Sequence, residues 1–256
     1  MYAQNITHKE ATGGRLVDSY AISKFQNTDN NYEFLGQYTK AINDFSVNVN
    51  VGANLYTTRF TRTVQSTVGG LSSPNTYTME ASVDRPVSTS YLREKQVQSV
   101  YAMGSFGYKD TYFIDASIRN DKSSALPVER NSYWYPSVSG SFVFSELMDS
   151  NILSYGKLRA SYAKAGSDFD PYMVTPTYGF GSVYSTTAGA INTILVPNSL
   201  KNPDLKPSFA NSFEIGTDLK FFKNRLGVEF TYYQQKNDNQ IINLAVSGAS
   251  GFESTV

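Results

Sequence analysis

Cysteine is absent from the 256 residues, and histidine occurs once, at His8. The lack of cysteine excludes a disulfide-linked scaffold, thiolate metal sites and a cysteine nucleophile. His8 lies between Thr7 and Lys9, near the start of the chain. We expect an exposed loop residue there, and not a metal ligand or a catalytic base. The chain therefore lacks the residues on which many enzymes depend.

The chain also lacks an excess of charge and any long apolar run. Lys+Arg and Asp+Glu both number 22, whereas nucleic-acid-binding proteins usually carry a basic excess. No apolar stretch approaches the roughly 18 residues of a transmembrane helix. The first ten residues lack the apolar segment of a signal peptide, and residues 251–256 provide no closing strand. We therefore expect a piece of a longer protein.

Aromatic residues are abundant, with 19 Tyr and 16 Phe, and the clearest pattern that contains them is at 211–233. Apolar side chains share one parity on each side of the Lys223-Asn224 turn; they are Phe213, Ile215, Leu219, Phe221, Leu226, Val228, Phe230 and Tyr232. Side chains on a strand alternate between its two faces, so each arm has an apolar face and a polar face. Each arm is about ten residues long, which is enough to cross a membrane as a tilted strand.

The same alternation predicts about nine strands, at 15–26, 31–40, 44–58, 95–107, 111–120, 133–144, 156–165, 211–222 and 225–233. An Asn/Asp turn is expected at 27–31. Long loops are expected near 59–94, 121–132 and 166–210, and they alternate with shorter connections. Outer-membrane barrels have short turns at one rim and longer loops at the other. The order favours an all-β antiparallel transmembrane β-barrel over a soluble β-sandwich, which shares the alternation.

Motifs for chemistry are weak in this chain. Ser154–Lys157 and Ser161–Lys164 match the Ser-x-x-Lys spacing of penicillin-binding enzymes, but both lie around an expected strand and not on a helix. Asp168 and Asp170 precede Pro171, where turn chemistry explains them better than catalysis or calcium binding. We therefore predict no catalytic residue, no metal site and no cofactor.

Aromatic side chains in the expected loops are candidates for substrate binding. Tyr133, Trp134, Tyr178 and Tyr184, with Phe180 beside them, could stack on sugar rings or cover a peptide. The same side chains could equally pack the loops or form an aromatic girdle at the membrane surface.

Several segments resemble one known family, the SusC/RagA TonB-linked outer-membrane proteins. In chain order these segments are Gly70–Tyr77, Arg119–Pro127, Tyr135–Val138, Phe142–Leu147, Leu158–Tyr162, Asn202–Pro207, Ser212–Gly216, Phe221–Leu226, Phe230–Tyr233 and Val246–Phe252. The similarity runs from about residue 70 to 252, and the first 60 residues fit by strand pattern alone.

The resemblance implies a 22-stranded TonB-dependent barrel with an N-terminal plug domain, of which the chain would be a part without the plug. Such proteins import glycan fragments or peptides across the outer membrane of Bacteroidetes. A SusD-like lipoprotein caps the outer mouth of the barrel, and the TonB–ExbB–ExbD complex supplies the energy. No catalytic or metal-binding residue of the family carries over to these positions.

The hypothesis from the sequence is thus outer-membrane nutrient import, with polar residues lining a wet lumen. The residues expected there are Arg159, Glu214, Asp218, Lys220 and Glu229. The alternative is a secreted, soluble β-sandwich domain that binds carbohydrate, in which the face of Phe213 and Ile215 would be buried against a second sheet. An enzyme ranks third.

Overall fold

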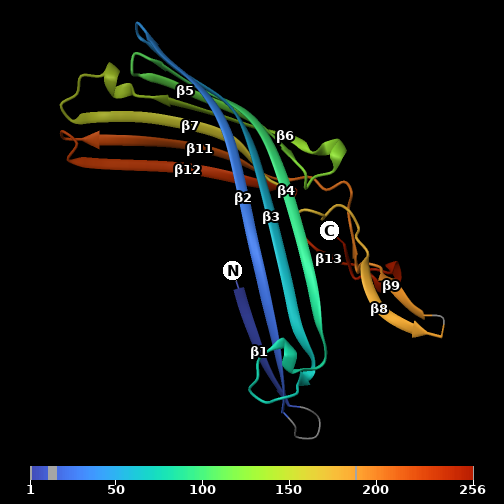
Figure 1. The fold of residues 1–256 in the computed structure, drawn as a ribbon. Coiled ribbons are helices and arrows are strands. Elements are labelled where there is room, and N and C mark those ends of the chain that lie inside the picture. Colours follow the sequence, from blue (N-terminus) through green and yellow to red (C-terminus); the bar gives the residue numbers. More distant parts are fainter. Residues whose placement is uncertain (1, 11–15, 188, 256) are drawn as a thin grey trace. The chain divides into compact units, whose positions relative to one another are not determined.

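The computed structural model describes residues 2–10, 16–187 and 189–255, and strands make up most of this part of the chain (Figure 1). The remaining regular elements are four short 3-10 helices: η1 Met79–Ala81, η2 Val128–Arg130, η3 Phe144–Leu147 and η4 Gly248–Ser250. Within these described residues, no helix is long and apolar enough to cross a membrane.

Nine strands form the main sheet, in the order β1-β2-β3-β4-β5-β6-β7-β11-β12. Their bounds are β1 Tyr2–Glu10, β2 Leu16–Ile42, β3 Phe45–Leu71, β4 Ser82–Tyr108, β5 Tyr112–Ser123, β6 Ser132–Phe142, β7 Leu153–Ser167, β11 Ser208–Phe221 and β12 Leu226–Asp238. The pairing of neighbours such as β4 with β5 and β11 with β12 is antiparallel. The predicted all-β antiparallel class is therefore confirmed.

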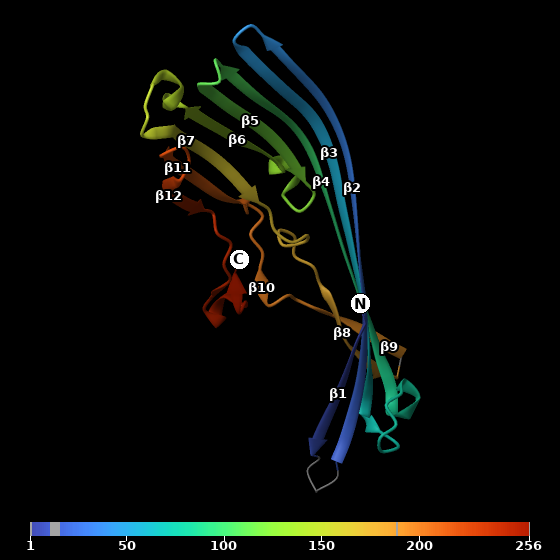
Figure 2. The same ribbon diagram turned by 90° about the vertical axis from the view of Figure 1, so that its left-hand side faces the viewer.

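Two smaller sheets lie in the connection between β7 and β11 and after β12 (Figure 2). One is a hairpin of β8 Gly179–Thr186 and β9 Gly189–Leu195. The other joins β10 Ser199–Leu200, β13 Leu244–Ala245 and β14 Ser254–Thr255. The expected long loop at 166–210 therefore contains secondary structure of its own.

The chain divides into two compact units. The first unit contains Met1–Asn30 and Tyr56–Lys95, and the second contains Asn31–Leu55 and Gln96–Val256. In the first unit, the rings of Phe25 and Phe60 lie 6.5 Å apart between centroids. The ring of Tyr91 contacts Phe60 from the other side, at 6.3 Å. Aromatic contacts thus join strands β2, β3 and β4 of this unit.

In the first unit the structure differs from the expected turn at 27–31, because β2 runs through it without interruption. The polar side chains expected to turn the chain find partners on β3 instead. Tyr56 donates a hydrogen bond to Asp29 (3.1 Å), and Thr58 donates one to Asn27 (3.3 Å). Cross-strand hydrogen bonds offset the poor strand propensity of Asn and Asp.

The predicted loop at 59–94 is also wrong, since β3 continues to Leu71 and β4 begins at Ser82. Pro86 was one reason for expecting a loop. The register of β4 with β5 begins only at Val97, so Pro86 lies on a stretch of β4 that has no β5 beside it. An edge position of this kind tolerates proline because no ladder hydrogen bond is lost on that side.

The main sheet has nine strands, as predicted, but they are not the same nine strands. Two expected strands merge into β2, while β1, which includes His8, pairs with β2 and was not expected. Where a loop was expected at 121–132, the structure has a shorter connection between Ser123 and Ser132.

In the second unit, one face of the main sheet is apolar and open. Its side chains alternate with polar ones along each strand and are 44–74% exposed. This apolar face comprises Phe34, Val51, Val100, Phe106, Ile114, Ile118, Val138, Leu158, Phe213, Ile215, Val228 and Phe230. A face this apolar on a water-soluble domain would be covered.

Tight turns lie at one end of these strands, here named the turn end. Asn43, Lys109, Asp110, Lys223 and Asn224 there have φ values between 50° and 64°, the left-handed region that tight turns use. The opposite end, here named the loop end, carries the connections at 124–131 and 168–207, whereas the turn end also carries the connection at 143–152 between β6 and β7. Strands β5, β6, β7, β11 and β12 are 11–15 residues long, enough to cross a membrane when tilted.

Candidate functional site

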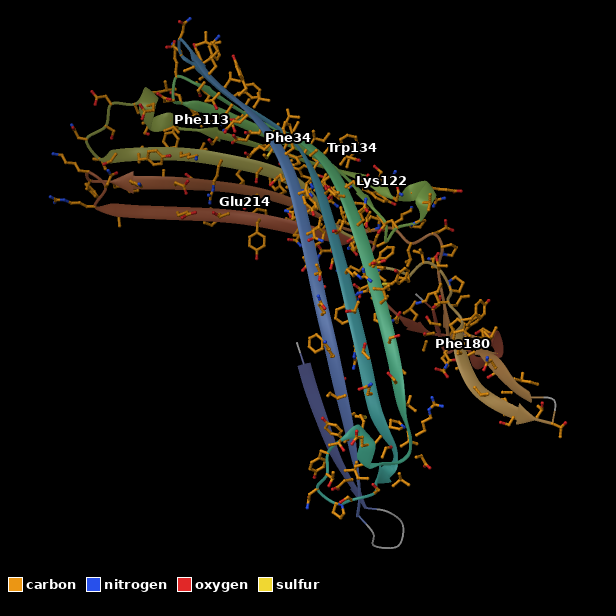
Figure 3. All side chains as sticks on the ribbon, in the orientation of Figure 1. Phe34, Phe113, Lys122, Trp134, Phe180 and Glu214 are labelled. Carbon is orange, nitrogen blue, oxygen red and sulfur yellow. The ribbon has the colours of Figure 1, made fainter. Side chains whose placement is uncertain are left out.

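The candidate site is the polar face of the second unit, on the side of the main sheet opposite the apolar face. Its side chains share the other parity on each strand. They include Glu33, Ser99, Tyr101, Asp115, Ser117, Arg119, Tyr135, Ser137, Ser139, Lys157, Arg159, Ser161, Glu214, Asp218, Lys220, Glu229 and Thr231. Glu214, labelled in Figure 3, marks this face on β11.

One group of contacts on the polar face centres on Tyr101 of β4. Its hydroxyl donates a hydrogen bond to Glu33 of β2, and the ring lies over Gly52 of β3, where a Cβ atom would overlap it. The guanidinium of Arg119 lies 5.9 Å from the centre of the ring. The same guanidinium donates to Ser99 (2.9 Å). A tyrosine and an arginine thereby connect four strands.

A second group centres on Arg159 of β7, which reaches across β11 to β12. Its Nη2 atom donates to Glu229 (2.9 Å) and to Thr231 (2.6 Å), and it lies 3.8 Å from Glu214. The crossing is possible because Gly216 of β11 lies beneath the guanidinium. A Cβ atom at that position would be 2.6 Å from Arg159 Nε.

Smaller polar contacts continue between these two groups. The Ser117 and Ser137 hydroxyls are 2.6 Å apart, and Ser139 donates to Asp115 (3.3 Å). Charges of both signs and hydroxyl groups therefore cover this face without a single dominant charge. Such a surface can hold water and offers hydrogen bonds to a polar solute, but it does not select strongly for an anion or a cation.

At the loop end, a small hydrophobic core holds the connections together. Leu126, Phe169 and Leu205 are buried, and Tyr133 and Ile241 pack against them. Two polar contacts join the same segments. The Ser123 hydroxyl donates to Asp168, and Arg130 lies 3.1 Å from Asp204. The connections at 124–131 and 168–207 are thus packed on each other.

The four residues predicted to bind substrate have different environments. Tyr133 packs on the loop core, and its ring lies 5.7 Å from that of Phe209. Trp134 lies on the apolar face and is 56% exposed. Tyr178 and Tyr184 are 64% and 61% exposed, before and within the β8–β9 hairpin. Substrate binding by these residues stays a prediction, although packing explains Tyr133 and membrane contact explains Trp134.

The residues that the sequence pattern did not single out are Glu33, Tyr101 and Arg119. Their parity within each strand was readable, since Tyr101 alternates with Val100 and Ala102. The sequence did not reveal that Glu33 and Tyr101, which are 68 positions apart, meet across the sheet.

The structure does not support catalysis at the Ser-x-x-Lys motif of Ser161 and Lys164. Ser161 faces the polar side of β7, whereas three positions along a strand place Lys164 on the other parity, so the amine does not face the hydroxyl. Within residues 2–10, 16–187 and 189–255, no group of three or more His, Cys, Asp or Glu side chains could hold a metal ion.

Comparisons with known proteins agree with this geometry. The family model described as "TonB dependent receptor-like, beta-barrel" matches residues 2–255. Among curated proteins, TonB-dependent receptor P26 of Formosa agariphila is 29% identical over 175 residues, which cover 66% of this chain and 17% of that protein. TonB-dependent receptor P39 of the same organism is 30% identical over 160 residues, covering 61% and 15%. The chain thus spans about a sixth of the length of these relatives.

Solved structures show the same fold. The RagAB peptide transporter superposes with a TM-score of 0.79 at 22% identity, over 93% of this chain and 27% of that chain. The RagAB peptide importer in its open-open state gives a TM-score of 0.80 at 20% identity, over 99% and 28%. An open apolar face, a polar face behind it and these matches lead to one conclusion: the chain belongs to the TonB-dependent receptor-like β-barrel family and forms part of the wall of a barrel in the outer membrane.

Proposed function

We propose that the chain is the wall of a TonB-energised importer that carries oligosaccharides or peptides across the outer membrane. The observation that carries the proposal is the presence of an open apolar face and a charged polar face on the same strands. The apolar face contacts lipid, and the polar face lines the lumen through which the solute passes.

The composition of the polar face suits a polar, uncharged or zwitterionic cargo. Arg119 and Arg159 are already engaged by acceptors from their own sheet. They therefore do not present an unpaired cation that would retain an anionic solute. Serine and threonine hydroxyls between them offer exchangeable hydrogen bonds, which favour passage over tight binding.

Two partners belong to this proposal. The TonB–ExbB–ExbD complex would supply the energy for import, acting through other parts of the protein. A SusD-like lipoprotein would cover the outer mouth of the barrel. The similarity to a structure described as a peptide transporter supports a peptide cargo as one option, and the curated relatives named as TonB-dependent receptors support the energised step.

The test is uptake by cells that carry or lack the gene for the full-length protein. Both strains are given a defined mixture of peptides and a defined mixture of oligosaccharides, and depletion of each compound from the medium is followed by mass spectrometry. We expect the deletion strain to lose depletion of one class, to the level of a strain without TonB. A plasmid copy should restore it.

Equal depletion of both mixtures by the two strains would contradict the proposal. If the strain without TonB depleted the compounds as fast as the wild type, the protein would be a passive pore and the energised step would be contradicted. The strain without TonB is therefore the control that separates active import from passive leakage.

The β8–β9 hairpin is the part of the chain that we propose to contact the lipoprotein lid. It lies at the loop end and exposes large apolar side chains, among them Phe180 (87%), which Figure 3 labels, and Tyr184 (61%). We expect Phe180→Ser with Tyr184→Ser to reduce the amount of lipoprotein that copurifies with the full-length protein. Loss of two exposed aromatic anchors removes contact area at little cost to folding.

The matched control is Leu147→Ser with Ile152→Ser. These side chains are similarly exposed (63% and 59%) but lie in the connection at the turn end. They should leave copurification unchanged. If the hairpin variant retains the lipoprotein as well as the control does, the hairpin does not contact the lid.

The alternative of a soluble carbohydrate-binding β-sandwich is wrong. That fold required Phe213 and Ile215 to be buried against a second sheet, but the two side chains are 44% and 48% exposed. The barrel family match covers nearly the whole chain.

A further inference from the structure

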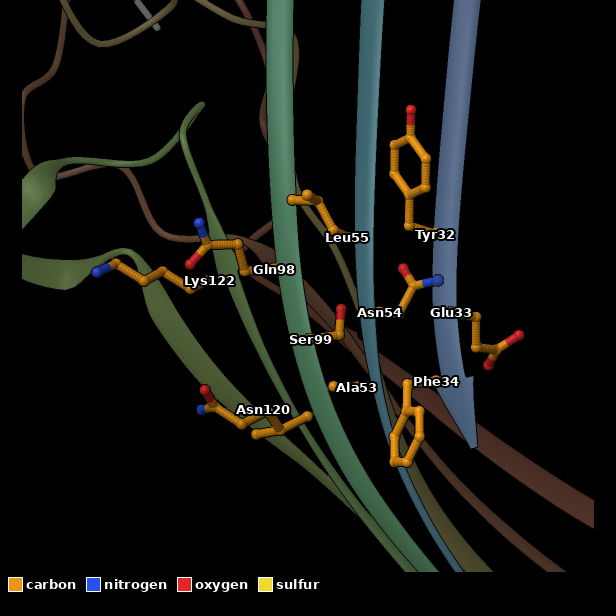
Figure 4. Close-up of a pocket in the computed structure, with 11 residues that line it drawn as sticks. Tyr32, Glu33, Phe34, Ala53, Asn54, Leu55, Gln98, Ser99, Asn120 and Lys122 are labelled. Atoms are coloured by element: carbon orange, nitrogen blue, oxygen red, sulfur yellow. The ribbon is translucent and has the colours of Figure 1, made fainter. Parts of the chain in front are cut away.

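The apolar face of the second unit contains a shallow groove near the loop end. The groove has a volume of about 530 Å³ and crosses β2, β3, β4 and β5 (Figure 4). On the apolar face its floor is formed by Phe34, Ala53, Leu55 and Val100. Glu33 points away from these residues, toward Tyr101 on the opposite face.

One side of the groove is polar. Gln98 and Lys122 are paired across β4 and β5, and Asn120 is the next residue of the same parity along β5. In the part of the chain that the structure describes, no carboxylate pairs with the exposed Lys122. The groove therefore has an apolar floor and, at its polar side, a cation without a counter-ion.

Trp134 gives the depth of this lysine in the membrane. It lies on the same face and is the Cα partner of Asn120, while Lys122, opposite Ser132, lies two pairs further toward the loop end. Tryptophan concentrates at the boundary between hydrocarbon and headgroups. Lys122 is thus at headgroup depth, and lysine on a lipid-facing surface extends its amine toward that layer.

We propose that the groove binds one membrane lipid with an anionic phosphate headgroup. The acyl chain would lie along Phe34, Leu55 and Val100, and the phosphate would accept hydrogen bonds from Lys122 and Gln98. Because the apolar face is directed to the bilayer, a lipid is the molecule that contacts the groove. The unpaired Lys122 favours an anionic headgroup. The inference depends on the barrel lying in a membrane and stands whether or not the import proposal holds.

The test is native mass spectrometry of the full-length protein in detergent, titrated with phosphatidylglycerol or with phosphatidylcholine of the same acyl chains. The wild type should bind phosphatidylglycerol more tightly. Lys122→Gln should weaken this binding by about fivefold, as expected for one lysine at a charged lipid surface, and should weaken phosphatidylcholine binding by a smaller factor, because the choline cation balances that phosphate. Lys223→Gln makes the same charge change at the turn end and should have no effect.

A second variant tests the apolar part of the groove. Ala53→Phe fills the floor on an exposed position of β3 and should weaken both lipids equally. Equal binding of the two lipids by the wild type, or full binding by Lys122→Gln, would overturn the proposal. Inorganic phosphate that competes with phosphatidylglycerol at equal concentration would also overturn it, because the site would then recognise a free anion.

Discussion

Ile215→Arg is expected to destabilise the full-length protein in a lipid bilayer by about 2–4 kcal/mol. Ile215 is 48% exposed at the middle of the apolar row of β11, between Phe213 and Leu219. A charge at this depth must be taken out of water into hydrocarbon. The measurement is reversible unfolding in lipid vesicles by guanidinium, followed by tryptophan fluorescence.

The control is Ser161→Arg on the polar face of β7. Ser161 is the Cα partner of Glu214, so an arginine there meets water and a carboxylate, and we expect a change below about 1 kcal/mol. Equal costs at the two positions would show that the face of Ile215 does not contact lipid. Complete failure of Ile215→Arg to fold, with normal folding of Ser161→Arg, would indicate a buried core at that face.

Gly216→Val is expected to cost about 2–3 kcal/mol, although valine is a better strand former than glycine. A Cβ atom at this position comes within 2.6 Å of Arg159 Nε and 3.1 Å of the Phe230 carbonyl oxygen. The arginine must leave its path across β11 and lose its hydrogen bonds to Glu229 and Thr231. The same unfolding measurement gives the cost.

A double-mutant cycle isolates this cause. Arg159→Met alone should cost about 1–2 kcal/mol, a value reduced because the Arg159 side chain is 33% exposed. In the Arg159→Met background, Gly216→Val should cost at least about 1 kcal/mol less than in the wild type. Strictly additive effects would contradict the crossing geometry. Gly227→Ala, where nothing lies within 4 Å of the added Cβ, is the control for glycine replacement on a strand.

Local pattern was sufficient for the strands of the second unit. The parity of Phe213, Ile215 and Val228 predicted the apolar face, and it is the face that the structure leaves open. The expected arms at 211–222 and 225–233 correspond to β11 and β12. This succeeds because alternation is a property of each strand by itself and does not depend on its neighbours.

The local sequence pattern predicted the wrong structure where pairing with neighbouring strands determines the backbone conformation. The Asn/Asp segment at 27–31 and the Gly/Pro-containing segment at 59–94 have the composition of turns and loops. Partners such as Tyr56 and Thr58 on β3 hold the first of them extended. Pro86 is tolerated since β5 does not reach it. Pairing over long sequence separation overrode local preference in both cases.

By itself, the sequence determined that the chain lacks cysteine and predicted a two-faced, all-β membrane wall, because composition and alternation are local properties. The tertiary structure alone decided which polar side chains meet, as in Glu33 with Tyr101 and Arg159 with Glu229. It also decided that Lys122 lies beside an apolar groove. The physical reason is register: contacts across strands depend on how distant segments align, and a single-residue slip would turn each side chain to the other face.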